Sequence, residues 1–240
     1  MELLTSKLHS VLWRLGLSPL LIDRWSGTRR RLKSSGPVVA LTFDDGPDPG
    51  STPLILEVLE RTGVKASFFM VGDRARAHPD LARNIASAGH AVGSHSLTHA
   101  DISTLSWRGA YGEYRDGRRA LEEILGAPQR LFRPPRGFLS VPTGMMARIL
   151  GLRLWLWSND GEDWKPGVTD EDILASIGDV GPGDVILLHD APEVEPPGRP
   201  RLATAAALER LIRVLSDRGL EPVALSPHSR GIWRTRSPRR

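Results

Sequence analysis

The 240-residue sequence contains no cysteine. This absence excludes disulfide bonds, thiolate metal ligands and a cysteine nucleophile, and it leaves the compartment open. The sequence also lacks internal repeats and any apolar run long enough to cross a bilayer as a helix. With 40% apolar and 25% charged residues, the composition is that of a globular protein, and one α/β domain is the simplest expectation.

Net positive charge is missing from the middle of the chain. Residues 1–35 carry a net charge of +5 and residues 230–240 another +5, whereas the whole chain carries +4, so the 194 residues between them carry −6. The two ends therefore account for the high isoelectric point. A body of this charge is not typical of nucleic-acid-binding proteins, and we expect no nucleic-acid partner.

The basic N-terminal segment, residues 1–35, has apolar residues at helical spacing. They are Leu4, Leu8, Val11, Leu12 and Leu15. Arg14 interrupts this stretch, Pro19 breaks it and no small-residue cleavage site follows, so the segment does not match a signal peptide. The stripe predicts a helix packed on the domain. The alternative is peripheral membrane contact through residues 1–35, aided by the cluster "TRRRLK", so the protein is expected either in the cytoplasm or at a membrane surface.

Strand-like apolar runs alternate with helix-like patterns through the centre of the chain. The expected strands are 38–43, 66–71, 90–94, 130–133, 152–157 and 184–188. The expected helices are 53–62, 79–88, 106–126, 140–150, 170–178 and 203–218, the first with Thr52 as cap and Gly63 as stop. Such alternation requires crossover connections and hence a parallel sheet, either a barrel or an open doubly wound sheet. We assign residues 36–229 to this domain and residues 230–240 to a basic tail.

Polar residues follow the predicted strands at the point where each strand ends. The clusters are Asp44 with Asp45, "HSLTH" (95–99), "RPPRG" (133–137), "NDGEDW" (159–164) and "LLHD" (187–190). Because the carboxyl ends of parallel strands share one edge, we expect these clusters to converge in space. Taken singly each is weak, since "DDGP" can be a local turn, "RPPRG" a rigid loop and His189 a core histidine.

Two histidines and an aspartate doublet together favour a divalent-cation site. His95 and His99 stand four residues apart, on one side of a helical turn, and one carboxylate from Asp44 and Asp45 would complete a catalytic site with an open position. The other aspartate then stays available as a base, because the cation offsets the repulsion between adjacent carboxylates.

Two other enzyme classes use comparable residues. A non-haem iron oxygenase also binds its metal with two histidines and one carboxylate. Such an enzyme is expected to have an all-β fold, whereas the pattern of this chain predicts an α/β fold. A glycosidase needs two carboxylates on opposite sides of one bond, and Asp44 and Asp45 are adjacent in sequence.

The motifs "TFDDGP", "HSLTH", "RPPRG", "DGEDW" and "LLHD", in this order, resemble the five signature motifs of the polysaccharide deacetylase family, the NodB-homology domains of carbohydrate esterase family 4. The resemblance spans about residues 36 to 225. It implies a distorted (β/α) barrel with parallel strands and a single catalytic domain. It also implies removal of N-acetyl or O-acetyl groups from glycans with a bound divalent metal, zinc first, with cobalt, manganese or nickel as alternatives. We expect a monomer.

The resemblance implies a role for each motif residue near the cation. Asp44 would be the general base, and Asp45, His95 and His99 would be the metal ligands. Arg133 would pair with Asp44 and keep it ionised.

The remaining motif residues would serve the leaving group and the substrate. His189 would be the general acid and Asp163 would orient it, while Trp164 and Leu188 would line the pocket for the acyl methyl group. Arg136 occupies a position where the family commonly has an aromatic residue. Its backbone N–H could still bind the oxyanion, but an arginine side chain favours an anionic glycan or glycolipid, unless it points to solvent.

The expected function is therefore hydrolysis of an N-acyl group, acetyl before formyl, from an amino sugar in a glycan or glycolipid. An O-acetyl esterase acting on a polysaccharide is the first alternative. A non-catalytic carbohydrate- or lipid-binding domain of the same fold is the second, and the presence of every expected catalytic residue disfavours it.

Overall fold

A computed structural model describes residues 19–34, 36–192, 201–226 and 232–233 of the chain. The predicted helical stripe from Leu4 to Leu15, most of the Pro-rich stretch 191–200 and nearly all of the basic tail lie outside these residues. In the described part, no helix is both long enough and apolar enough to span a bilayer.

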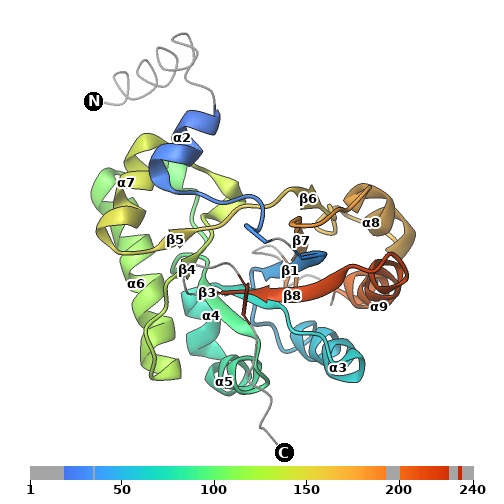
Figure 1. The fold of residues 1–240 in the computed structure, drawn as a ribbon. Helices are drawn as coiled ribbons and strands as arrows, with labels where there is room; N and C mark the ends of the chain where they lie inside the picture. The colour runs from blue at the N-terminus through green and yellow to red at the C-terminus, as the bar shows by residue number, and fades with distance from the viewer. Residues whose placement is uncertain (1–18, 35, 193–200, 227–231, 234–240) are drawn as a thin grey trace, which may run out of the picture.

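A parallel sheet forms the centre of the molecule and curls into a partial barrel (Figure 1). Along the sheet the order is β5-β4-β3-β2-β1-β7-β6, with β8 beside β1 and β9 antiparallel to β8. The strands are β1 (Val38–Asp44), β2 (Ser67–Met70), β3 (Ala91–Ser94), β4 (Leu131–Phe132), β5 (Arg153–Leu154), β6 (Asn159–Asp160), β7 (Val185–His189), β8 (Glu221–Leu225) and β9 (Ile232–Trp233). The predicted distorted (β/α) barrel with parallel strands is confirmed.

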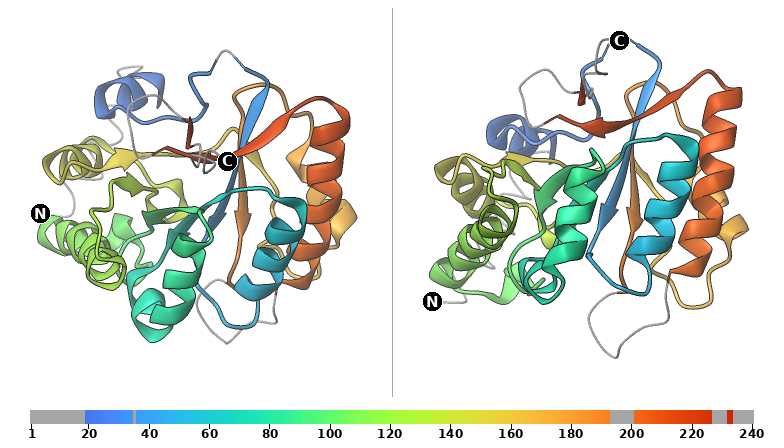
Figure 2. Two further views of the ribbon diagram at one scale, coloured as in Figure 1. Left: turned by 60° about the horizontal axis from the view of Figure 1, so that its bottom comes forward. Right: turned by 90° about the horizontal axis from the view of Figure 1, so that it is seen from below.

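Helices cover the outside of the curled sheet (Figure 2). They are α2 (Pro19–Ser26), α3 (Thr52–Thr62), α4 (Gly72–Ala77), α5 (Pro79–Ser87), α6 (Trp107–Leu125), α7 (Val141–Ile149), α8 (Asp170–Ile177) and α9 (Leu202–Asp217), with short 3₁₀ turns η1 (Ile102–Thr104) and η2 (Pro135–Gly137). Each long helix returns the chain from the carboxyl edge of the sheet to its amino edge. The connections that enter the helices therefore gather at the carboxyl edge, which is where the site forms.

The ends of α3 follow from local sequence. Pro53 stands in the first turn and Gly63 ends the helix in a left-handed conformation with φ 69°, as the sequence predicts. The N-cap position is Ser51, so the expected cap at Thr52 is wrong. The Thr52 hydroxyl instead donates to a carboxylate oxygen of Asp190 at 2.6 Å, because the loop after β7 lies directly over this helix end.

Several short elements have no counterpart among the expected ones. The six residues of α4, "GDRARA", carry no apolar stripe, and the helix packs through Gly72 and Ala75 against α6. A Cβ atom at Gly72 would lie 3.1 Å from the Gly117 backbone, so only small residues allow this approach. The β4 and β5 ladders are also shorter than the apolar runs predict, since Trp155 leaves β5 and pairs with Arg29 in an isolated bridge.

Candidate active site

Asp44 and Asp45 lie at the carboxyl end of β1, a strand whose seven residues are all buried. Asp45 adopts a left-handed conformation with φ 79°, so the backbone turns sharply between the two residues. The two carboxylates consequently have different main partners. Asp44 accepts a hydrogen bond from Arg133 at 2.7 Å, and its Oδ2 lies 3.7 Å from His95 Nε2. Asp45 lies closer to His95 and also faces His99. The doublet is divided between two buried polar environments.

Asp45, His95 and His99 form a cluster that could hold a metal ion. Asp45 Oδ1 lies 3.4 Å from His95 Nε2 and 3.2 Å from His99 Nε2, and the ligand atoms all lie within 4.8 Å of one another. His95 Nδ1 lies 2.7 Å from the backbone carbonyl of Arg133, so Nδ1 carries the proton and donates it there. Nε2 then turns a lone pair toward Asp45 Oδ1, a buried atom without a hydrogen-bond partner among the described residues. Opposed lone pairs in a buried space suit a cation, so the donor set fits a divalent metal.

Left-handed backbone conformations concentrate at this edge of the sheet. Asp45, His99 and Arg136 have φ angles of 79°, 63° and 55°, and Ser96 has 69°. Residues with a side chain rarely adopt such angles, and each costs on the order of 1–3 kcal/mol unless local contacts offset it. The fold therefore holds strained backbone at residues that carry candidate chemistry.

Arg133 is fully buried, and its side chain donates hydrogen bonds to groups inside the protein. Its Nη1 donates to Asp44 Oδ1 at 2.7 Å and to Thr42 Oγ1 at 2.9 Å. Its Nε and Nη2 donate to the carbonyls of Trp155 and Leu156 at 3.2 and 3.3 Å. A guanidinium held at these points cannot rotate freely, so it fixes the orientation of the Asp44 carboxylate.

His189 is held by Asp163 through two contacts. The ring Nδ1 lies 2.6 Å from Asp163 Oδ1, and the backbone N–H of His189 donates to Asp163 Oδ2 at 2.9 Å. Asp163 is itself fixed by Thr204, whose hydroxyl donates to Oδ2 at 2.7 Å, and by Arg201, which donates to its backbone carbonyl at 2.6 Å. With Nδ1 engaged, Nε2 is the ring atom available for a substrate.

The pKa of His189 is raised to about 9. Burial, the largest single effect, would lower this pKa, but the charge of Asp163 and its hydrogen bond to the ring outweigh burial. The pKa of Asp163 is lowered by the same pairing, against the effect of burial. His189 is therefore cationic and Asp163 anionic at neutral pH.

The register of the sheet places Asp44 beside His189. These residues are direct partners in the parallel ladder between β1 and β7, and the backbone N–H of Asp190 donates to the carbonyl of Asp44 at 3.1 Å. Partners in register point to the same face of a sheet. The structure thus brings the candidate base and the candidate acid together on adjacent strands, with the Asp45 cluster next to them.

The three side chains expected to meet the substrate lie in different surroundings. Arg136 has a side chain 58% exposed, with Nη1 3.4 Å from Asp101 Oδ2. Trp164 is 46% exposed, whereas Leu188 is fully buried in the main apolar core. A Cβ atom at Gly161 would lie only 2.6 Å from the Leu188 side chain. Arg136 and Trp164 are therefore open to solvent, and the roles of all three side chains stay predictions.

Asp190 is a buried residue at the end of the motif "LLHD", and the sequence does not reveal its role. Its Oδ1 accepts the backbone N–H of Gly46 at 3.0 Å and its Oδ2 accepts the Thr52 hydroxyl. Burial raises its pKa to about 7. A Cβ atom at Gly46 would lie 2.0 Å from this carboxylate, so glycine is required there. Asp190 therefore braces the turn that directly follows Asp45.

Thr204, Arg201 and Arg74 also support the site, and no motif marks them. Thr204 and Arg201 stand at the start of α9, about forty positions from Asp163 in sequence, and they reach it only through the packing of that helix. Arg74 donates to the backbone carbonyls of Asp45 and Pro192 at 3.0 and 2.8 Å, linking the loops after β1 and β7. The only sequence feature that could have pointed to these residues is a polar side chain near the start of a helix.

Comparisons with known proteins identify the family of the chain. The sequence model of the family described as "Polysaccharide deacetylase" matches residues 31–155. A peptidoglycan-N-acetylglucosamine deacetylase of Bacillus cereus is 34% identical over 192 residues, which cover 79% of this chain and 86% of the relative. A chitooligosaccharide deacetylase of Sinorhizobium fredii is 38% identical over 197 residues, covering 79% and 90%.

A solved structure extends the likeness to three dimensions. It is a peptidoglycan N-acetylglucosamine deacetylase in complex with a naphthalenyl N-hydroxybenzamide, with a TM-score of 0.80 and 30% identity over 87% of this chain and 95% of that one. The resemblance stated from the five motifs is confirmed. The chain belongs to the polysaccharide deacetylase family, a family of hydrolases that cleave carbon–nitrogen bonds.

Proposed function

We propose that the protein removes N-acetyl groups from amino sugars of a glycan in a reaction that depends on a divalent metal. The observation that carries the proposal is the placement of three functional groups at one edge of the sheet. These are the cluster of Asp45, His95 and His99, the Arg133-bound carboxylate of Asp44, and the Asp163-bound ring of His189.

Asp45, His95 and His99 would hold the metal, because their buried lone pairs converge and the position of each is set by the backbone. A bound divalent metal, with zinc as the first candidate, supplies an acidified water molecule and polarises a carbonyl group. The absence of cysteine leaves only oxygen and nitrogen ligands, which zinc, cobalt, manganese and nickel all accept.

Asp44 acts as the base in this proposal. It accepts a proton from water as the water oxygen bonds to the acetyl carbon, and Arg133 holds its carboxylate in place. The acetyl oxygen becomes negatively charged and would accept a hydrogen bond from the backbone N–H of Arg136, a residue in a left-handed conformation.

His189 acts as the acid in the second half of the reaction. It donates its Nε2 proton to the sugar nitrogen as the carbon–nitrogen bond breaks, leaving a free amine and acetate. Asp163 stabilises the cationic ring before the transfer and holds it in one orientation. The base thus acts on the attacking water and the acid on the leaving nitrogen, on opposite sides of one tetrahedral carbon. Their positions on adjacent strands allow this arrangement.

Relatives with this family's motifs favour an N-acetylated substrate. Those described above act on peptidoglycan N-acetylglucosamine and on chitooligosaccharides. The charge of Arg136 is countered by Asp101 at 3.4 Å, which weakens the case for an anionic glycolipid. We therefore place uncharged N-acetylglucosamine units before anionic or O-acetylated substrates.

Acetate release from a panel of substrates tests this function. Chitooligosaccharide, peptidoglycan, acetylxylan and an anionic glycolipid would be incubated with metal-loaded protein, with Asp44→Asn as the inactive control. We expect acetate and new free amines from the first two. Release from acetylxylan alone would assign an O-acetyl esterase, and no release from any substrate by metal-loaded protein would favour a non-catalytic binding domain.

A further inference from the structure

The side of the molecule formed by α2 and α7 combines exposed apolar side chains with arginines. Trp25, Met145 and Ile149 are 42%, 44% and 60% exposed. Helix α2 packs directly on α7, and Arg148 of α7 lies over the Trp25 ring and donates to the Trp25 carbonyl. We call this surface the α2–α7 face. It comprises Arg24, Trp25, Met145, Arg148 and Ile149 together with three arginines on adjoining backbone segments, Arg29, Arg130 and Arg153. The backbone N–H of Arg153 donates to the Arg130 carbonyl at 2.7 Å, and that of Arg29 donates to the Leu154 carbonyl at 3.0 Å.

The arginines of this face are crowded and lack counter-charges. Within the part of the chain that the structure describes, no ion pair involves Arg24, Arg29, Arg130 or Arg153. Burial, followed by the charges of Arg29 and Arg130, lowers the pKa of Arg153. A buried guanidinium nitrogen of Arg153, Nη1, has no hydrogen-bond partner among the described residues. Arg24 and Arg130 are exposed, so the cluster presents positive charge at the surface that an external anion could neutralise.

Nearby acids are already paired with other arginines. Asp23 accepts a hydrogen bond from Arg30 at 2.6 Å, and Asp184 forms an ion pair with Arg31. Nearer Arg130, Glu122 lies 3.5 Å from Arg118 Nε and accepts the backbone N–H of Gln129 at 3.1 Å. These acids satisfy local partners and leave the excess positive charge of the face in place.

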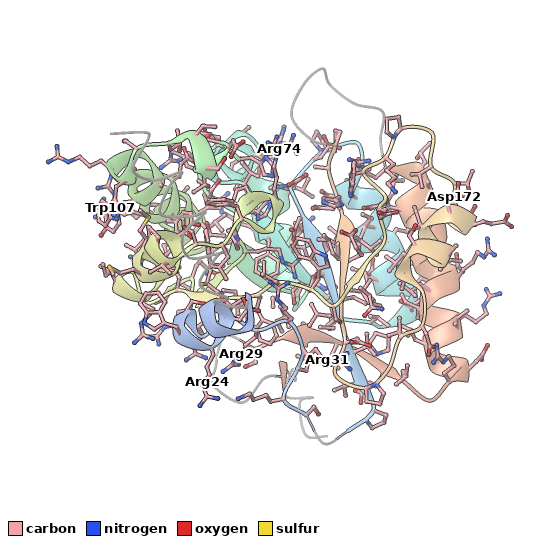
Figure 3. All side chains as sticks on the ribbon, turned by 90° about the horizontal axis from the view of Figure 1, so that it is seen from above. Arg24, Arg29, Arg31, Arg74, Trp107 and Asp172 are labelled. Carbon is pink, nitrogen blue, oxygen red and sulfur yellow. The ribbon has the colours of Figure 1, made fainter. Side chains whose placement is uncertain are left out.

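The labelled part of this face, Arg24 and Arg29, lies on the opposite side of the molecule from Arg74 beside the candidate active site (Figure 3). Arg24, Arg29 and Arg31 project from one side in that view, and Arg74, which contacts the Asp45 loop, lies on the other. The topology gives the same result, because Arg130 and Arg153 stand at the amino ends of β4 and β5 and the site stands at the carboxyl ends.

We propose that the α2–α7 face docks the protein on the surface of an anionic phospholipid bilayer. Arginine binds phosphate with paired hydrogen bonds, and tryptophan and isoleucine favour the boundary between headgroups and acyl chains. The sequence that immediately precedes α2 has the same two features, an apolar stripe from Leu4 to Leu15 and the basic residues Lys7 and Arg14. Docking in this orientation leaves the candidate active site facing away from the bilayer, toward glycan.

Other occupants fit the face less well. A second copy of the chain would bring two uncompensated arginine clusters together, which repel each other. A soluble polyanion would neutralise the arginines but would gain nothing from Met145 and Ile149. A bilayer uses both the charge and the apolar side chains.

Co-sedimentation of the full chain with lipid vesicles tests the proposal without reference to catalysis. We expect binding to vesicles that contain phosphatidylglycerol, weakened by salt, and little binding to phosphatidylcholine alone. The double variant Arg24→Gln/Arg130→Gln should bind about 25-fold more weakly, since each basic residue near an anionic surface contributes about fivefold. Met145→Ser/Ile149→Ser should reduce binding severalfold at low and high salt alike. The matched control Arg213→Gln/Val214→Ser, on exposed positions of α9, should bind as the wild type does.

Three outcomes would overturn the proposal. The first is equal binding of wild type and both face variants. The second is binding to dextran sulfate, but not to vesicles, without dependence on Met145 and Ile149, which would assign a soluble-anion site. The third is no vesicle binding by wild type with a lowered melting temperature of Met145→Ser/Ile149→Ser, which would show that the chain's own N-terminal segment covers the face.

Discussion

Asp44→Asn should lower kcat for N-acetyl hydrolysis by about a thousandfold, because an amide cannot accept a proton from water and general-base catalysis contributes on the order of 10²–10⁴. The variant should bind metal as the wild type does, since Asp44 is bound to Arg133 and lies 3.7 Å from His95, whereas Asp45 lies closer to His95 and also faces His99. Steady-state kinetics and metal analysis of the same purified samples measure both quantities. A variant that loses metal and activity together would assign Asp44 as a ligand instead.

The control for this substitution concerns Arg133. This side chain is completely buried, and the neutral amide leaves its charge uncompensated, which can cost several kcal/mol of folding free energy. The amide oxygen can still accept the 2.7 Å hydrogen bond, so the fold should persist with a lower melting temperature. Activity is therefore compared at a temperature where both proteins are shown to be folded. Full activity of folded Asp44→Asn would remove Asp44 from the mechanism.

His189→Ala should lower kcat by a similar factor, about 10²–10⁴, with metal still bound, because the leaving nitrogen then receives no positioned proton. The wild-type rate should also depend on the protonation of His189. The ring is protonated below its pKa of about 9 and loses the proton as pH rises through that value, so kcat should fall on the alkaline side near pH 9.

Asp163→Asn provides the matched test of the pH dependence. Asp163 is the largest cause that raises the pKa of His189, so its neutralisation should move the alkaline limb of the kcat profile to lower pH. The residual activity should be highest at acidic pH, where the ring remains protonated. An unchanged alkaline limb in Asp163→Asn, or full activity in His189→Ala, would contradict the assignment of His189 as the acid.

The location of the site could be predicted from sequence because one rule of topology applies to all its parts. Asp44, His95, Arg133 and His189 each follow or end an apolar run, and the carboxyl ends of parallel strands meet at one edge. Long, mostly apolar strands such as β1 could be predicted because both of their faces are buried. The strand pattern alone thus located most of the candidate chemistry.

Elements that tertiary contacts create were not predictable in this way. The β8 sequence "EPVAL" begins with a charged residue and contains proline, and it becomes a strand by pairing with Val38–Ala40 of β1. The two residues of β6, Asn159 and Asp160, are polar and pair with β7. Neither segment carries an apolar run as long as those that predicted the other strands.

The supporting residues of the site were missed for a related reason. Asp190 bonds to Gly46 and Thr52, which stand 144 and 138 positions away in sequence. Thr204 reaches Asp163 across 41 positions. Hydrogen bonds between such distant residues leave no spacing signal, so only the folded structure identifies the residues that hold the reactive groups in place.

Metal titration of metal-free protein, followed by acetate release from chitooligosaccharide, tests whether the reaction depends on a metal held by Asp45, His95 and His99. We expect no release without metal and a rise that saturates at one divalent ion per chain. Asp45→Asn should lose this tight binding, because Asp45 supplies the only carboxylate of the cluster. Two results would contradict a metal-dependent reaction at this cluster. One is acetate release at full rate from metal-free protein, and the other is release from Asp45→Asn that saturates at the same metal concentration as in the wild type.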